Sequence, residues 1–98
     1  MVEYLYDAIR AVAGQEIVVN AVIADENENL ITENCYFVLH DEATHEVIAK
    51  VLGNYLVDNA CWEFSISPEL TKGRFGRYMY CIQHDDSNLC FKQPIYLM

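Results

Sequence analysis

The chain has 98 residues, of which 53% are hydrophobic and 21% are charged, a composition typical of one folded domain rather than a disordered segment. Its 15 Asp and Glu residues outnumber its 6 Lys and Arg residues, so the formal net charge is −9. Because binding to a phosphate backbone requires a basic face, this charge argues against a nucleic-acid-binding protein. We expect a single domain over residues 1–98, with residues 1–13 as an N-terminal arm or first strand.

The N-terminal segment allows two interpretations. Leu5, Ala8 and Val12 have the spacing of one helical face. Tyr4 and Tyr6 equally fit the alternation of an edge strand. The segment carries an acidic residue and no apolar core of the kind found in secretory signals, and the chain contains no run long enough for a membrane span. We therefore expect the chain to fold in a cytoplasm.

Six later segments are predicted to be strands, because they are rich in β-branched and aromatic residues and are separated by turn-forming clusters. The clearest is CWEFSIS, in which Trp62, Phe64 and Ile66 alternate with smaller or polar residues. Short strands at this spacing are typical of an antiparallel sandwich or barrel. The predicted strands are residues 16–24, 35–40, 46–52, 61–67, 77–84 and 89–97.

The last two predicted strands should form a hairpin. Asp85–Asn88, which reads DDSN, would be its four-residue loop, so that His84 would face Leu89. The tyrosines and isoleucine of RYMYCI would then lie on one face of the paired strands.

The stretch HDEATH, residues 40–45, is the strongest candidate for a metal site. It is similar to HExxH, in which two histidines four residues apart share one face of a helix and bind zinc. Here the histidines are five residues apart, which is about 500° on a helix, so they would point in different directions. The flanking runs also favour strands. We therefore interpret Asp41–Thr44 as a hairpin loop that places His40 opposite His45.

Other clusters also have structural interpretations that outweigh the chemical ones. KGRFGR, residues 72–77, offers three cations around Phe75 for a phosphate or RNA site, but its two glycines favour a turn that leads into a strand. The acidic turns at residues 25–29 and 85–88 do not supply the roughly six to eight ordered oxygens that calcium requires. We predict no catalytic, cofactor-binding or metal-binding residues.

The four cysteines contain no CxxC pair, which argues against a structural zinc site. Residues 16–24 contain no cysteine, so an antibody-type disulfide is not expected. Cys81 lies three residues before His84, on the opposite strand face, and no third residue that would orient a catalytic pair is evident. We interpret the thiols as small apolar side chains on strands. The cysteines are Cys35, Cys61, Cys81 and Cys90.

Several predicted strands are apolar on both faces, whereas an isolated sandwich should have polar outer positions. Either a neighbouring segment covers these outer positions or they contact another subunit. The predicted interface residues are Tyr4, Tyr6, Val18, Val22, Met79 and Cys81.

Three stretches together resemble a known family. They are IRAVAGQEIVVNAVIADENENLIT, CYFVLHDEATHEVIAK and LTKGRFGRYMYCIQHDDSNLCFKQPIYLM. Their order is similar to that of the immunoglobulin-like domains of bacteriophage structural proteins, in particular the N-terminal domains of upper baseplate proteins and their prophage relatives. Within the last stretch, GRYMYCI also resembles the corner and strand of immunoglobulin-like sandwiches.

The resemblance implies an all-β, immunoglobulin-like antiparallel β-sandwich of about seven strands, with residues 3–12 as a strand. It implies a virion protein of a tail, baseplate or capsid-associated assembly, made in the host cytoplasm and acting as a homo-oligomer with other virion proteins. No catalytic residues carry over from the family, so we expect no enzymatic activity and no cofactor. The charge and the lack of a long apolar run lead us to expect no nucleic-acid or membrane partner.

The main alternative is a carbohydrate-binding sandwich, in which exposed aromatic rings would form a platform for a sugar. Trp62 discriminates between the two, because its alternation with Phe64 and Ile66 predicts a core position. A small metal-dependent enzyme is a third alternative, and it would require a stoichiometric metal.

Overall fold

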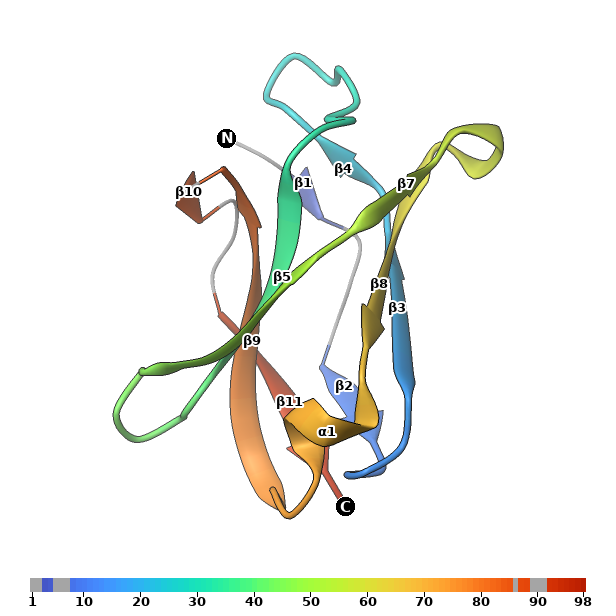
Figure 1. Cartoon of the computed structure of the whole chain (residues 1–98). Helices are drawn as coiled ribbons and strands as arrows, with labels where there is room; N and C mark the ends of the chain where they lie inside the picture. The colour runs from blue at the N-terminus through green and yellow to red at the C-terminus, as the bar shows by residue number, and fades with distance from the viewer. Residues whose placement is uncertain (1–2, 5–7, 86, 89–91) are drawn as a thin grey trace.

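The computed structural model describes residues 3–4, 8–85, 87–88 and 92–98. Two β-sheets pack against each other in a molecule of 39 × 27 × 20 Å (Figure 1). The large sheet has the strand order β2 (Ile9–Ala11), β11 (Gln93–Leu97), β9 (Gly76–His84), β5 (Cys35–His40) and β6 (Val47–Leu52), with β10 (Ser87–Asn88) on β9. The small sheet has the order β3 (Ile17–Ala21), β8 (Cys61–Ile66) and β7 (Asn54–Leu56). A two-stranded ribbon pairs β1 (Glu3–Tyr4) with β4 (Ile23–Ala24).

The prediction of an all-β, immunoglobulin-like sandwich is confirmed. The order β3-β8-β7 is that of strands B, E and D of immunoglobulin domains, and β11-β9-β5-β6 is that of strands G, F, C and C′ of the variable type. In the part of the chain that the structure describes, the two sheets contain nine strands rather than about seven. Their described pairings are antiparallel except for that of β11 with β2, which is parallel.

The core lies between the two sheets and is built by alternation along the strands. On β8, Trp62 and Phe64 are buried and Ser65 is exposed, as the sequence predicts. The ring of Phe37 on β5 stacks on that of Tyr80 on β9, with 5.1 Å between the centroids, and lies 6.3 Å from the ring of Phe64. Each such ring buries roughly 150–250 Å², so these aromatic side chains are large contributors to the core between the sheets.

The chain passes from the large sheet to the small one at Gly53. β6 ends one residue before this glycine and β7 begins one residue after it, so the two form one diagonal ribbon in Figure 1. A Cβ atom at position 53 would lie 2.4 Å from Cε1 of Phe64 and 2.7 Å from Cε3 of Trp62. The sequence predicts that Gly53 and Asn54 end the run EVIAKVL, and β6 does end at Leu52. Asn54, however, begins a further strand, β7, that is not among the predicted elements.

The other predicted strands agree with the structure, with two changes. The segment 16–24 is divided into β3 and β4 at Val22. The segment 89–97 contains β11 from Gln93, and residues 89–91 lie outside the described residues. The polar segment after β8 contains a short helix, α1 (Pro68–Thr71), which is not among the predicted elements.

The N-terminal segment is a strand where it is described. β2 pairs with the C-terminal strand β11, and Tyr4 belongs to β1. The strand interpretation is therefore confirmed for residues 3–4 and 9–11, and Tyr6 lies outside the described residues. No helix in the described ranges is long and apolar enough to cross a membrane.

The hairpin after β9 is tighter than predicted. Ser87 pairs with His84 and Asn88 pairs with Gln83, so the chain turns within two residues rather than four. Asp85 has a φ of 53°, in the left-handed region that two-residue type I′ hairpin loops require. The predicted pairing of His84 with Leu89 is therefore wrong, because Ser87 occupies the position opposite His84.

Candidate interaction surface

One face of the large sheet points away from the core. On β9, Tyr80 and Ile82 are core residues, so Met79 and Cys81 point to the opposite side. The strand register places the outward residues of β2, β11, β5 and β6 beside them. We call this surface the basic-aromatic face. Its accessible residues are Arg10, Tyr36, Val47, Lys50, Leu52, Arg77, Met79, Gln83, Pro94 and Tyr96.

Tyrosines and cations are interleaved on the basic-aromatic face. Tyr96 on β11 pairs with Arg10 on β2 and with Arg77 on β9, so it lies between two arginines. The guanidinium carbon of Arg10 is 5.9 Å from the Tyr96 ring centroid. On the other side of the face, Nζ of Lys50 is 4.5 Å from the centroid of Tyr36. Both distances lie within the range of cation–π attraction, which orients the cations along the face.

The composition of this face is that of a protein contact surface. Along β2, β11, β9, β5 and β6, the described outward positions carry no Asp or Glu. Tyr, Met and Arg are enriched at the cores of protein–protein interfaces, and Lys, Asp and Glu are depleted there, so Lys50 is the one departure among the charged residues of the face. Leu52 adds an exposed aliphatic side chain, 61% exposed, at the β6 edge.

The centre of the face is buried and hydrogen-bonded. Val38 and Cys81 are 0% exposed, and His40 is 4% exposed. Nδ1 of His40 lies 3.3 Å from the carbonyl oxygen of His45, and Nε2 lies 3.3 Å from Sγ of Cys81. These partners assign the neutral imidazole, because Nδ1–H donates to the carbonyl and Nε2 accepts from the thiol. The side chains at the centre of the face are therefore packed and hydrogen-bonded within the chain.

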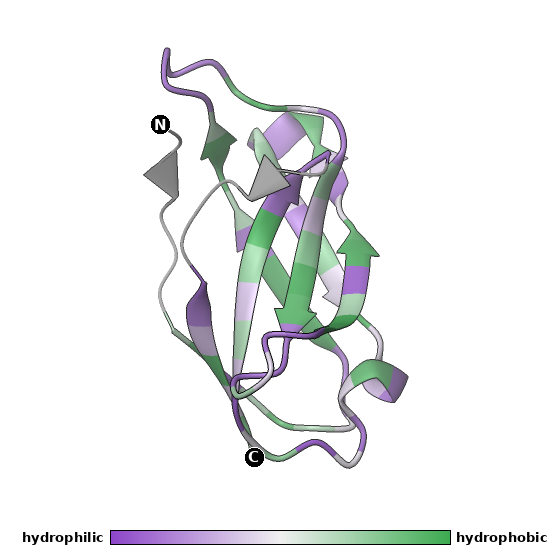
Figure 2. Ribbon diagram, turned by 90° about the vertical axis from the view of Figure 1, so that its left-hand side faces the viewer, coloured by the Kyte–Doolittle hydropathy of each residue, from purple (hydrophilic) through white to green (hydrophobic). Residues whose placement is uncertain are grey.

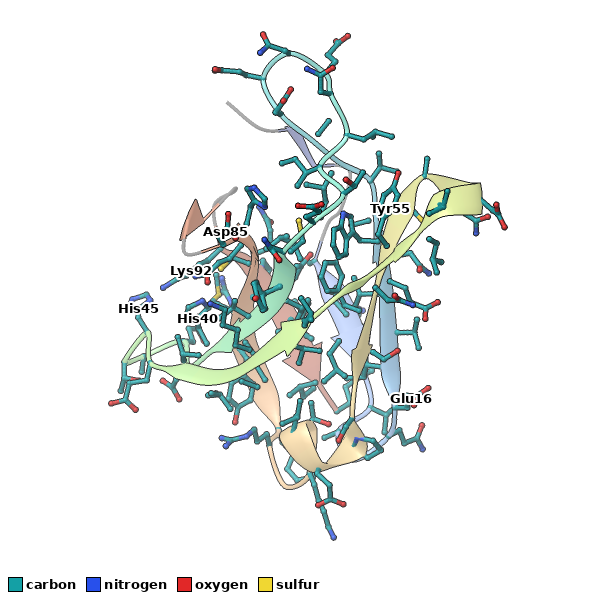
Figure 3. All side chains as sticks on the ribbon, turned by 45° about the horizontal axis from the view of Figure 1, so that its top comes forward. Glu16, His40, His45, Tyr55, Asp85 and Lys92 are labelled. Atoms are coloured by element: carbon teal, nitrogen blue, oxygen red, sulfur yellow. The ribbon has the colours of Figure 1, made fainter. Side chains whose placement is uncertain are left out.

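Burial is also the main reason why the pKa of His40 is lowered from its ordinary value. The charges of Lys92 and His45 lower it further, and the hydrogen bond to the His45 carbonyl acts in the opposite direction. Figure 3 shows His40, His45 and Lys92 on the same side of the molecule, where Nζ of Lys92 is 3.4 Å from Nδ1 of His45. His40 therefore stays neutral near neutral pH.

The HDEATH stretch forms the turn between β5 and β6, as predicted. The Oδ1 atom of Asp41 accepts hydrogen bonds of 2.9 Å from the backbone N–H groups of Ala43 and Thr44. The bond from Thr44 is the main cause of the lowered pKa of Asp41. These bonds are those of an Asx turn, so this carboxylate stabilises the loop.

The predicted register of this turn is wrong. His40 pairs with Val47 rather than with His45, because the pairing shifts between Leu39 and His40. His45 lies in the loop with a φ of 61°. The described residues contain no group of three or more His, Cys, Asp and Glu side chains arranged to hold a metal ion.

The predicted interface residues do not form one surface. Val18 and Val22 are 47% and 43% exposed, on and just beyond β3 of the small sheet, whereas Met79 is on the basic-aromatic face. The two sets therefore lie on opposite sides of the sandwich. Cys81 is corrected from a contact residue to a buried one, because its side chain is fully covered and bonded to His40.

Arg10, Tyr36, Lys50 and Tyr96 were missing from the predicted interface. Alternation along CYFVLH and EVIAKVL is enough to direct Tyr36 and Lys50 outward. Alternation does not show which strands far apart in the sequence are neighbours, because that depends on the strand order of the sheet.

HDEATH and KGRFGR meet at one end of the molecule. Nε of Arg77 is 3.2 Å from Oε1 of Glu42, and Phe75 is 68% exposed beside them. Together they border an open depression of roughly 460 Å³, lined by Asp41, Glu42, Ala43, Phe75, Arg77 and Tyr78. The interpretation of KGRFGR as a turn before a strand agrees with the structure, since β9 begins at Gly76.

Cys35, Cys61 and Cys81 are free thiols, and Cys90 lies outside the described residues. Burial, with a contribution from the charge of Asp85, raises the pKa of Cys35 to about 12. Cys35 is a core residue, which agrees with its interpretation as a small apolar side chain.

No protein-family model, curated protein or solved structure matches this chain, so its own fold and surfaces carry the assignment of function.

Proposed function

We propose that this chain is a structural protein of a bacteriophage or prophage virion and that it acts by assembly with other protein subunits. The observation that carries the proposal is the basic-aromatic face, in which aromatic and basic side chains surround a buried centre on a sheet surface that is ordinarily polar. The resemblance of the sequence to phage immunoglobulin-like domains supports the virion context.

The basic-aromatic face suits protein contact for energetic reasons. Tyrosine and arginine are over-represented among the residues that dominate binding energies, because they combine large contact areas with specific polar groups. The Tyr96 ring contacts Arg10 at 5.9 Å, and Arg77 pairs with Glu42, so both arginines already have a partner within the chain. A surface that is already ordered loses less conformational entropy on association.

Quantitative mass spectrometry of purified virions tests this proposal. Particles released from a source strain after prophage induction should contain the chain in several copies per particle. A variant with Arg10→Glu and Lys50→Glu should be expressed and folded but reduced in the particles. Lys72→Glu, on the turn after α1, makes the same kind of charge change away from the face and should be incorporated normally. Particles that lack the wild-type chain would contradict the proposal.

A glycan-binding module is the second candidate, and one observation favours it. The depression beside Phe75 combines an exposed ring with the carboxylates of Asp41 and Glu42 and the guanidinium of Arg77. Rings that stack on sugar C–H groups and planar polar groups that bind hydroxyls are suited to carbohydrate ligands.

Trp62 does not contribute to such a site. It is 3% exposed, and its Nε1–H donates a 2.7 Å hydrogen bond to the carbonyl oxygen of Ile31. Amide NMR spectra recorded during glycan titration test the second candidate. Binding should shift the Phe75 and Arg77 resonances, and Phe75→Ala should abolish the shifts. Unchanged spectra over a broad glycan panel would exclude the site as a glycan receptor.

A further inference from the structure

The cations of this acidic chain are concentrated on one surface. Four of the six Lys and Arg residues lie on or beside the basic-aromatic face, and these are Arg10, Lys50, Arg77 and Lys92. Glu42 pairs with Arg77 at the end of the face, with 3.2 Å between Nε and Oε1, so a cation of this face does contact a carboxylate. A partner of complementary charge would likewise present carboxylates.

The chain itself carries such a surface. No Lys or Arg occurs between Arg10 and Lys50, a stretch that contains eight acidic residues. Three of these, Glu26, Glu28 and Glu33, are exposed in the loop between β4 and β5. We call residues 25–33 the acidic loop. It projects from the top of the molecule in Figure 1 and is purple, the hydrophilic end of the scale, in Figure 2.

The acidic loop is held in a defined shape. Oδ1 of Asp25 accepts hydrogen bonds from the backbone N–H groups of Asn27, at 2.9 Å, and Asn29, at 3.0 Å. The backbone N–H of Asp25 donates to the carbonyl of Asn29 at 2.8 Å, so both sides of the loop are bonded together. Leu30, 44% exposed, adds an apolar contact at its base. The loop is therefore a compact acidic projection.

We propose that the basic-aromatic face binds the acidic loop of a second copy of this chain. Opposite charges across the contact would steer the two copies together, and the tyrosines and Leu30 would supply the apolar area. This inference deepens the proposed function, on which it rests, by naming one of the partners of the face.

A second copy fits better than a nucleic acid for a simple reason. A phosphate backbone is charged along its whole length, so charge beyond the face would lie against a molecule whose net charge is −9. The acidic loop concentrates its carboxylates in one compact projection. Nucleic acid binding is one outcome of the experiment.

Charge exchange between two variants tests the contact. The face variant carries Arg10→Glu and Lys50→Glu, and the loop variant carries Glu26→Lys and Glu28→Lys, all at exposed positions. Sedimentation velocity should show that the wild type self-associates and that each variant alone does so at least about tenfold more weakly. In an equimolar mixture, the basic loop of one variant meets the acidic face of the other, while their unchanged surfaces also match. Association should therefore return to the wild-type level.

Sedimentation velocity of control variants shows whether the effect is specific to the face and the loop. Lys72→Glu and Glu69→Lys, at and beside α1, should leave self-association unchanged, and circular dichroism should show native sheet content for every variant. A wild type that stays monomeric, variants that associate normally, or a mixture whose association stays weak would each overturn the inference. Binding of the wild-type protein to single-stranded DNA through this face, without self-association, would also overturn it. If the wild type is monomeric but is still incorporated into virions through this face, the proposed self-association is wrong and the proposed assembly with other virion proteins is not affected.

Discussion

His40 is the most constrained polar side chain of the basic-aromatic face. Its two nitrogens have different partners, the carbonyl of His45 and the thiol of Cys81, and the neutral imidazole satisfies both when Nδ1–H donates to the carbonyl and Nε2 accepts from the thiol. Protonation would replace the acceptor at Nε2 by a second N–H group facing the thiol. Because burial lowers the pKa of His40, the unfolded chain takes up this proton at a higher pH than the folded chain.

We therefore expect the free energy of unfolding to fall as the pH is lowered below about 6.5, the ordinary histidine value, and the contribution of His40 to this decrease to level off below its pKa in the folded state. Urea titrations across this range measure the effect. His40→Gln should remove part of this decrease, whereas His45→Gln, at an exposed loop position, should retain it. Equal pH dependence in the wild type and His40→Gln would contradict the assigned neutral state.

Cys35 illustrates how burial controls reactivity at a single residue. The thiolate is the form that reacts with alkylating agents, and the raised pKa of about 12 leaves Cys35 protonated in mildly alkaline buffer. Cys61 is only partly buried.

Iodoacetamide at about pH 8.5 should therefore modify Cys61 and spare Cys35 in the folded protein. Mass spectrometry of the digested protein identifies each modified thiol, and both should react in urea. Modification of Cys35 at the rate of Cys61 without urea would show that the core opens readily.

At the scale of elements, the passage from β6 to β7 requires glycine at position 53, because there is no room for a side chain. The rings of Trp62 and Phe64 occupy the space where a Cβ atom at position 53 would lie. The continuous strand between the two sheets is thus possible because residue 53 is glycine.

Gly53→Ala should destabilise the protein by about 3 kcal/mol, since an added methyl group in a packed core forces rings or backbone to move. Gly73→Ala provides a matched control. Nothing lies within 4 Å of its added Cβ, and its φ of +77° alone should cost about 1 kcal/mol. Thermal or urea unfolding measures both. A smaller loss for Gly53→Ala than for Gly73→Ala would contradict the packing described here.

The short helix α1 is tied to the turn between β2 and β3. Oγ1 of Thr71, a residue that is 1% exposed, accepts a 3.0 Å hydrogen bond from the backbone N–H of Gly14. Thr71→Val keeps the shape of the side chain and removes this acceptor, so it should cost about 1 kcal/mol relative to the wild type. Thr71→Ser keeps the acceptor and loses only the buried methyl group, so it measures the packing contribution separately. Comparable stability of Thr71→Val and the wild type would show that water replaces the bond.

Alternation and turn chemistry predict most of the strands from the sequence. CYFVLH agrees with β5 at both ends, because cross-strand packing on both faces reinforces its β-branched and aromatic residues. The strand β7 was missed, because glycine and asparagine ordinarily end a strand and only the rings beneath Gly53 show why this one continues. By contrast, Ser67-Pro68-Glu69 is a recognisable helix start, with the Ser67 hydroxyl accepting from the Glu69 N–H, so α1 was predictable.

The site was less predictable than the fold. The register shift at His40 depends on one irregular pairing, which turn length alone does not predict. The row of Arg10, Tyr96 and Arg77 joins both ends of the chain through the parallel pairing of β2 with β11. A local sequence pattern contains no information about that proximity.

At the scale of the whole molecule, association must overcome the net charge. Two copies that each carry −9, with centres about 30 Å apart, repel by about 4 kcal/mol at an ionic strength of about 0.01 M. The repulsion falls to about 0.3 kcal/mol at about 0.15 M, because the screening length shortens to about 8 Å. Contacts between opposite charges at about 4 Å are screened much less at this ionic strength, and they weaken only at higher salt.

Sedimentation velocity of the wild-type protein across ionic strength therefore tests the central claim, that the basic-aromatic face is a surface for self-assembly. The weight-average sedimentation coefficient should be greatest near about 0.15 M and lower at both about 0.01 M and about 1 M. A monomer at every ionic strength, or association that increases steadily up to the highest salt, would contradict it.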